Sequence, residues 1–436
     1  MAERFVKDAS RIFGGQLTMN VIGIASTVIT ARYLGPHDRG LFQLLTLLPV
    51  TLANLAKLGL PQANVYFIRR QNASPSNAVS NCLWFAIVLG TLMAVLCSAY
   101  QSQLRDTFFK EAPIAVIAPV LCLVPFLLFQ QYLLGIVSAQ MRFSEYNFQQ
   151  IVPTVLSLLG MVLSLIVLKQ GLLAALLVQT VVQAGSIVWL AVRVHRGAPI
   201  TLRWDAPLAK KQLSFGFKSY MQTLAASLHM RVDQYILAAF TDPAAVAQYG
   251  IAVRLAETLL KIPDAAGTAL YPRLAASKDQ DMHQVTLRAC RFTLFVAAVA
   301  AVGCAIIAPI AVRLLFGTRY EAAIVPTWLL LPGVVMMSLY HILTRNFTSR
   351  NKQQTNLIAA VIALGTNVAL NFWLIPLYGI AGAALSSTLS YSLSALVLLY
   401  LFVRETGHGV GEAVLMGRDD FDRLLRAAQS VRRRVA

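Results

Sequence analysis

Two stretches of the sequence decide the fold: ANLAKLGLPQANVYFIR at residues 53–69 and ETLLKIPDAAGTALYPR at residues 257–273. Three pairs of side chains in them are related by a shift of 204 or 205 residues: Lys57 and Lys261, Tyr66 and Tyr271, Arg69 and Arg273. Elsewhere, Gly160 and Gly365 are 205 residues apart. This shift is close to half of the 436-residue chain, so the sequence predicts two copies of one structural unit.

The composition is that of a membrane protein. Hydrophobic residues make up 57% of the chain and charged residues only 13%, and the mean hydropathy is +0.64. A water-soluble protein has about a quarter charged residues, so this composition excludes a soluble globular enzyme. Apolar runs of about 20 residues recur along the chain, which is enough to cross a hydrocarbon core of ~30 Å.

The apolar runs predict an all-α polytopic membrane protein with about 12 transmembrane helices. They cover residues 12–34, 41–68, 78–99, 113–139, 147–168, 172–194, 214–240, 245–272, 287–312, 322–345, 356–375 and 379–403. Because each half then contains an even number of helices, the two copies have the same orientation in the membrane, as in transporters built from parallel repeats. We expect two six-helix lobes around a central cavity, residues 1–200 and 201–404, and a basic cytoplasmic tail at 405–436.

The net charge of +18 is explained by membrane topology. With both termini inside, and residues at span ends counted with the adjoining loops, the cytoplasmic segments contain 26 of the 37 Lys and Arg residues and the outside loops contain seven. Basic loops are retained in the cytoplasm, so this bias predicts a multi-pass protein with both termini in the cytoplasm. A nucleic-acid partner is not needed to explain the charge. The tail fits either a basic amphipathic helix on an anionic leaflet or a disordered segment.

Seven charged side chains lie well inside the predicted spans: Lys57, Arg231, Asp233, Arg254, Glu257, Lys261 and Asp264. Each costs about 2.5–3.5 kcal/mol in a bilayer and normally faces a cavity or a partner. We interpret the basic ones, Lys57, Arg231, Arg254 and Lys261, as a cationic cavity that binds an anionic substrate. The acids, Asp233, Glu257 and Asp264, are candidates for coupling or for the cavity wall.

Two alternatives stay open for these charges. Arg254, Glu257, Lys261 and Asp264 fall on one face of a continuous helix, where they could neutralise one another. Lys57 could instead extend to a lipid headgroup. Asn54 and Asn64 share a helix face with Lys57 and are expected to line the same cavity. In the first span Gln16 and Asn20 belong to a polar stripe at helical spacing, which either lines the cavity or forms interhelical hydrogen bonds.

The sequence offers little for catalysis. The five cysteines all lie in apolar runs without a CxxC pair, which is typical of small buried hydrophobic residues. Asp279 and Asp281 form a DxD string without a nucleotide-binding unit, and no Walker A motif is present. We therefore expect no enzyme activity, no cofactor and no metal site.

Five short motifs resemble the polysaccharide transporter (O-antigen flippase) family of the multidrug/oligosaccharidyl-lipid/polysaccharide flippase superfamily: RYLGP at 32–36, RGLF at 39–42, LGL at 58–60, VYF at 65–67 and YGIAGAA at 378–384. Similarity in span number and repeat extends over about residues 10–403. The resemblance implies an alternating-access flippase that moves undecaprenyl-pyrophosphate-linked oligosaccharides from the inner to the outer leaflet. It also implies a cationic cavity, membrane lipids as surroundings, and polysaccharide polymerase and chain-length proteins as partners.

Three other functions compete with this one. A multidrug exporter of the same fold would usually need more acidic cavity residues, and a lipid II flippase often has additional helices. A membrane polymerase or ligase of polysaccharides would need a large outside loop with catalytic residues. The predicted outside loops are too short to hold such a catalytic site. The multidrug exporter and the lipid II flippase are therefore the main alternatives.

Overall fold

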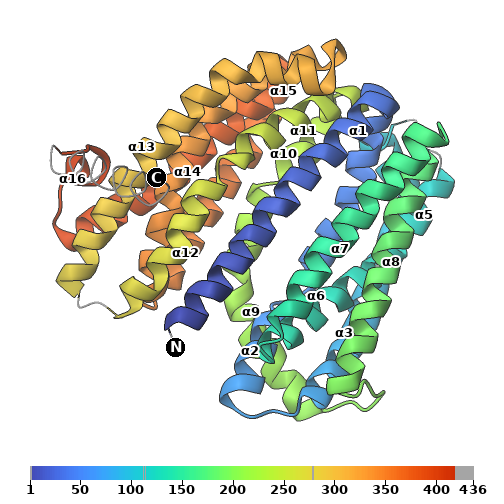
Figure 1. The fold of residues 1–436 in the computed structure, drawn as a ribbon, viewed down its shortest axis with the longest axis horizontal. Helices are drawn as coiled ribbons and strands as arrows, with labels where there is room; N and C mark the ends of the chain where they lie inside the picture. Colours follow the sequence, from blue (N-terminus) through green and yellow to red (C-terminus); the bar gives the residue numbers. More distant parts are fainter. Residues whose placement is uncertain (1, 111, 113, 277–278, 418–436) are drawn as a thin grey trace, which may run out of the picture. The chain divides into compact units, whose positions relative to one another are not determined.

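The protein is entirely helical throughout the part of the chain that can be described. The computed structural model describes residues 2–110, 112, 114–276 and 279–417, except that the side chains of 2–18, 114–115, 218–219, 268–269, 271–276 and 279–281 are left out. Every regular element in these ranges is a helix (Figure 1). Eight of the helices are long and apolar enough to cross a membrane. The prediction of an all-α, multi-pass membrane protein is therefore confirmed, while the number of 12 crossings stays a prediction.

The first half of the chain forms a series of helices up to residue 240. They are α1 (Ala2–Ala56), α2 (Leu60–Arg70), α3 (Pro75–Ala99), α4 (Gln101–Phe108), α5 (Ile114–Leu121), α6 (Leu123–Ala139), α7 (Phe143–Met161) with the π-helical η1 (Val162–Val167), α8 (Leu172–Gly197), α9 (Ala206–His229) and α10 (Val232–Phe240). Helix α4 lies in what was predicted to be an outside loop. Most of its residues are polar, so a search for apolar runs does not detect it.

The second half is built in the same way. It comprises α11 (Pro243–Thr258), α12 (Lys261–Ala276), α13 (Asp279–Ala311) with the π-helical η2 (Val312–Phe316), the 3₁₀-helical η3 (Thr318–Ala323), α14 (Ile324–Ser349), α15 (Gln353–Thr406) and the short α16 (Val410–Val414). By contacts within the chain, the protein divides into two compact units: residues 1–250 with 315–320, and residues 251–314 with 321–436. The lobe boundary at residue 200 stays a prediction from the repeat.

Two of the long helices, α1 and α15, each contain two predicted spans, and a glycine with non-helical dihedral angles marks the boundary between them. Gly35 interrupts α1 with φ 77° and ψ 172°, and Gly379 interrupts α15 with φ 55° and ψ −128°. Only glycine adopts such positive φ values readily. The predicted boundaries between residues 34 and 41 and between 375 and 379 are thus placed correctly.

Three predicted spans are interrupted rather than continuous, which corrects the sequence-based boundaries. The span at 41–68 breaks at residues 57–59, the span at 214–240 breaks at 230–231, and the span at 245–272 breaks at 259–260. At the first break Leu58 and Gly59 have φ values of 47° and 72°. At the third break Pro263 follows closely, and a proline cannot donate a backbone hydrogen bond to the preceding turn.

The exposed faces of the long helices are apolar, as a lipid environment requires. On α8, Leu173, Leu177 and Val181 are 57–66% exposed, whereas Leu190 and Val194 are completely buried on the opposite face. Helix α13 has a similar stripe of exposed apolar side chains at Val299, Val302, Ile306 and Ile310. Such stripes at helical spacing would be unfavourable in water, so these helices face hydrocarbon.

Within the first unit, α2, α3 and α9 are joined by a buried chain of amide groups. Gln212 donates a hydrogen bond from Nε2 to Oδ1 of Asn64 at 2.7 Å, and Asn81 donates from Nδ2 to Oε1 of Gln212 at 3.1 Å. All three side chains have an exposed fraction of 0%. Asn64 also donates to the Sγ of Cys82 at 3.1 Å. This network fixes the start of α9 against α2 and α3.

Replacing Gln212 with leucine is expected to destabilise the first unit. The apolar side chain has a similar volume but leaves the Asn64 carbonyl and one Asn81 amide hydrogen without a partner, which costs about 1–3 kcal/mol per buried group. The midpoint of thermal unfolding in detergent should fall relative to wild type. The matched control is Gln62→Leu, at an exposed position of α2. An unchanged midpoint for Gln212→Leu would show that this network does not contribute to stability.

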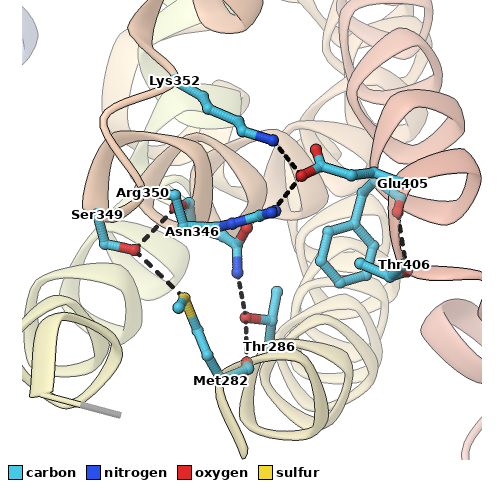
Figure 2. Close-up of polar contacts among 9 residues, drawn as sticks. Met282, Thr286, Asn346, Ser349, Arg350, Lys352, Glu405 and Thr406 are labelled. Carbon is cyan, nitrogen blue, oxygen red and sulfur yellow. Dashed lines mark hydrogen bonds and ion pairs between the residues drawn. The ribbon is translucent and has the colours of Figure 1, made fainter. Parts of the chain in front are cut away.

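The second unit contains its own core and its own polar cluster. Helices α13, α14 and α15 pack side by side around buried residues that include Leu287, Ile342 and Leu398 (Figure 1). At one end of this bundle the carboxylate of Glu405 forms ion pairs with both Arg350 and Lys352, as Figure 2 shows. These contacts fasten the end of α15 to the loop that follows α14.

Candidate substrate-binding site

Lys57 occupies the break between α1 and α2. Its carbonyl accepts a hydrogen bond from the Leu60 amide at 3.1 Å, which closes a tight turn in place of a helical turn. Its Nζ donates to Oδ1 of Asn54 at 3.1 Å and lies 5.7 Å from the ring centroid of Tyr220 on α9. The half-buried ammonium group therefore has one amide and one aromatic face as neighbours.

A close crossing of two glycines brings α9 to this break. A Cβ atom built on Gly59 would lie 2.1 Å from the carbonyl oxygen of Gly216, and a Cβ atom on Gly216 would lie 2.6 Å from the carbonyl oxygen of Leu58. Side chains are therefore excluded from both positions. This contact holds Tyr220, one helical turn further along α9, beside Lys57.

A cavity of about 220 Å³ lies between α1 and the end of α9. Its polar wall consists of Thr51 and Asn54 from α1 and of Ser227 and Arg231 from α9 and the break that follows it. The structure thus brings together three of the predicted residues, because Asn54 and Arg231 line the cavity and Lys57 binds Asn54. Tyr235 of α10 donates a hydrogen bond from its hydroxyl to Oγ1 of Thr51 at 2.8 Å, which orients this wall.

Asp233 is placed in a buried site on α10. Its exposed fraction is 1%, its Oδ1 accepts a hydrogen bond from the backbone amide of Gln234 at 2.8 Å, and its Oδ2 accepts one from the Tyr249 hydroxyl. Arg231, two residues earlier, lies at the break before α10 and lines the cavity. Asp233 is therefore a shielded carboxylate within the first unit.

The second unit contains a separate charged cluster. Asp264 of α12 pairs with Nδ1 of His341 on α14 at 3.0 Å and also interacts electrostatically with Lys261 and Arg345. Sequence reasoning did not select His341 or Arg345 for the cavity. Their spacing of four residues places both on one face of α14, and this periodicity was the signal that could have identified them.

Arg254 and Glu257 do not share a continuous helix with Lys261 and Asp264. Both belong to α11, which ends at Thr258, and α12 starts at Lys261 after the break. The prediction of one continuous helix over residues 254–264 is therefore wrong, and the spacing of the four charges along uninterrupted 100° steps does not apply. Arg254 and Glu257 are half-buried, and their place in a substrate site stays a prediction.

The predicted polar lining residues fall into different environments. Asn54 lines the cavity, whereas Asn64 is completely buried in the amide network with Gln212 and Cys82. Asn20 is half-buried on α1. The Gln16 side chain and residues 418–436 of the predicted tail lie outside the described part of the chain.

A second cavity, which sequence reasoning missed, is lined by glutamines. It has a volume of about 190 Å³ and is bordered by α1, α6 and α8. Gln130, Gln131, Gln179 and Gln183 contribute to its wall, and Gln183 donates a hydrogen bond to Oε1 of Gln130 at 2.7 Å. The pair Gln179 and Gln183, four residues apart in an apolar span, was the detectable signal.

The described side chains contain no group of three or more His, Cys, Asp or Glu residues that could hold a metal ion. All five cysteines are unpaired. The site in the first unit is built instead from two cations, amides and hydroxyls, which suits phosphate and sugar groups.

The comparisons with known proteins agree with this architecture. The family described as "Polysaccharide biosynthesis protein" matches residues 5–278. No curated protein matches the chain.

Three solved structures illustrate the shared fold. The lipid II flippase MurJ in an inward closed conformation has a TM-score of 0.76 at 14% identity and covers 89% of this chain and 87% of its own. An inward-facing multidrug resistance MATE family transporter of the MOP superfamily has a TM-score of 0.73 at 13% identity, and the match covers 89% of this chain and 94% of the transporter. A MOP superfamily transporter from Pyrococcus furiosus has a TM-score of 0.61 at 13% identity, and the match covers 92% of this chain and 94% of the transporter. The fold is thus that of these membrane transporters.

Proposed function

Because the chain belongs to the polysaccharide biosynthesis protein family, we propose that it is a flippase for lipid-linked oligosaccharides. Its substrate is an undecaprenyl-pyrophosphate-linked repeat unit, moved from the inner to the outer leaflet of the bacterial cytoplasmic membrane for the synthesis of a surface polysaccharide. Both termini lie in the cytoplasm. The observation that carries this proposal is the cavity wall that contains Asn54 and Arg231, with the ammonium group of Lys57 bound to Asn54.

The chemistry of this wall fits the polar part of such a substrate. A pyrophosphate is costly to bring into hydrocarbon unless cations and hydrogen-bond donors replace its water. Lys57 and Arg231 supply positive charge, and the Asn54 amide and the hydroxyls of Thr51 and Ser227 can bind sugar hydroxyl groups. The polyprenyl chain stays in the bilayer throughout. The protein therefore needs to shield only the charged and sugar-bearing head.

Transport then follows from a population shift between inward-open and outward-open states, without covalent chemistry. Asp233, Glu257 and Asp264 are the candidates for coupling to an ion. Arg254 and Lys261, with the neighbouring Arg345, are the cations of the second unit that could contact an anionic head. A polysaccharide polymerase and chain-length proteins would use the exported repeat units.

Deletion of the gene tests this function directly. We expect cytoplasm-facing lipid-linked repeat units to accumulate and surface polysaccharide to be lost, and both changes to be reversed by the wild-type gene on a plasmid. Lipid-linked sugars are measured by mass spectrometry of membrane extracts, and the surface glycan by gel analysis. Normal glycan together with new sensitivity to cationic drugs would replace the proposal by the drug-exporter function. Arrest of cell-wall synthesis with accumulated lipid II would replace it by the lipid II flippase function.

A further inference from the structure

A second basic pocket lies where α2 ends and α9 begins. It has a volume of about 570 Å³ and is lined by Tyr66, Phe67, Gln71, Lys210, Lys211, Ser214 and Phe215. Tyr66 and Phe215 are stacked with ring centroids 4.4 Å apart and an interplanar angle of 16°. Phe67 packs edge-on against both rings. The aromatic cluster forms a rigid wall beside two exposed lysines.

The electrostatics of the pocket favour an anion. Among the described residues that line it none is acidic, and both lysines are cationic at neutral pH. The carboxylate nearest in sequence, Asp205, is already engaged, because it accepts hydrogen bonds from the Leu208 amide and from Nδ2 of Asn77. Arg69 and Arg70 at the end of α2 add to the positive charge of this end of the unit.

The pocket is separate from the cavity that Asn54, Ser227 and Arg231 line. Lys211 precedes Ser227 by 16 residues on the same helix, which corresponds to roughly 24 Å along its axis. A cavity in the bilayer interior therefore leaves the pocket near the membrane surface, where tyrosine and lysine side chains meet lipid headgroups. The pocket also lies at the end of one span predicted from the sequence, 41–68, and near the start of another, 214–240, which agrees with this depth.

We propose that this pocket binds the phosphate group of an anionic membrane lipid. The ammonium groups of Lys210 and Lys211 contact the phosphate oxygens, the Ser214 hydroxyl and Gln71 amide bind the polar part of the headgroup, and the Tyr66–Phe215 stack covers the first carbons of the acyl chains. The lysines alone would serve a free phosphate equally well, but the aromatic wall gains contact area only from a molecule that has an apolar part.

The test uses purified full-length protein and measures lipid binding by native mass spectrometry with phosphatidylglycerol, phosphatidylcholine and inorganic phosphate. We expect phosphatidylglycerol to bind, and the double variant Lys210→Gln/Lys211→Gln to bind it about tenfold or more weakly. Phe215→Leu should weaken lipid binding several-fold. The matched control is Lys169→Gln, an exposed lysine elsewhere in the same unit, which should bind the lipid as wild type does. Lys57→Gln, in the proposed substrate site, should weaken binding far less than the double variant and so distinguishes the two sites.

Three outcomes would overturn the proposal. Equal binding of phosphatidylglycerol by wild type and the double lysine variant would show that the lipid binds elsewhere. Displacement of the lipid by inorganic phosphate at equal concentration, with no effect of Phe215→Leu, would show a site for the free ion. A loss with Lys57→Gln as large as that with the double variant would assign the lipid to the proposed substrate site. Since no transport is measured, failure here leaves the flippase proposal standing.

Discussion

Replacing Lys57 with glutamine is expected to reduce export of the glycan roughly tenfold or more, because a lost charged hydrogen bond corresponds to about 1.5–3 kcal/mol. Glutamine retains much of the length and a hydrogen bond to Asn54 but not the positive charge. The ammonium group lies at the break between α1 and α2, beside the cavity that contains Asn54 and Arg231. Export is measured as surface polysaccharide in a deletion strain complemented with each variant.

Two further variants define what the Lys57 result means. Lys57→Arg keeps the charge and should retain a substantial part of export, whereas Lys169→Gln removes an exposed lysine from the same unit and should have no effect. The amount of protein in the membrane is determined by immunoblot and should be equal for all variants. Wild-type export by Lys57→Gln at an equal amount of protein would remove Lys57 from the substrate site.

Replacing Gly59 with alanine is expected to prevent the first unit from folding stably. The positive φ of 72° costs an alanine roughly 1–2 kcal/mol, and overpacking costs about 1–3 kcal/mol more. The added Cβ atom would lie 2.1 Å from a backbone carbonyl oxygen of Gly216, which cannot move aside as a flexible side chain could. Gly216→Ala meets the carbonyl of Leu58 and should act in the same direction.

The measurement for Gly59→Ala is the yield of monodisperse protein after detergent extraction, followed by size-exclusion chromatography. Gly185→Ala is the matched control, because a Cβ atom at this position of α8 meets nothing within 4 Å. Its yield should equal or slightly exceed that of wild type, since alanine favours helix. Equal yields for Gly59→Ala and Gly185→Ala would contradict the close crossing of α2 and α9.

The fold could be predicted from the sequence wherever summed hydropathy decides the structure. The all-α membrane class and the boundaries at Gly35 and Gly379 follow from long apolar runs and short interruptions. The breaks at residues 57–59, 230–231 and 259–260 were missed, because hydropathy averages do not register backbone dihedral angles. The sequence Gly59-Leu60-Pro61 was the available signal for the first break, since glycine permits a positive φ and proline often occupies the first turn of a new helix.

The site could be predicted only in part, for a different reason. The cost of intramembrane charge selected Lys57 and Arg231, because that cost is a property of each residue alone. The structure places Arg231 in a cavity wall with Asn54, which Lys57 contacts, and the role of both cations in binding substrate stays a prediction. Asn64 was expected to line the cavity but is buried in a hydrogen-bond network, because its environment depends on Gln212, far away in the chain. The partner of Asp264, His341, was not selected for the same reason. Periodicity within one span contains no information on which neighbouring helix supplies the partner.

The breaks at residues 57–59 and 259–260 occur at corresponding places of the two related stretches, and each lies next to a lysine. At both breaks a tighter turn replaces the helical hydrogen-bond pattern: the Leu60 amide donates to the Lys57 carbonyl, and the Leu260 amide donates to the Glu257 carbonyl. The helix that follows each break therefore takes a direction that the helix before it does not impose. A substitution in either turn is thus expected to change the angle between two helices rather than the helicity of either one.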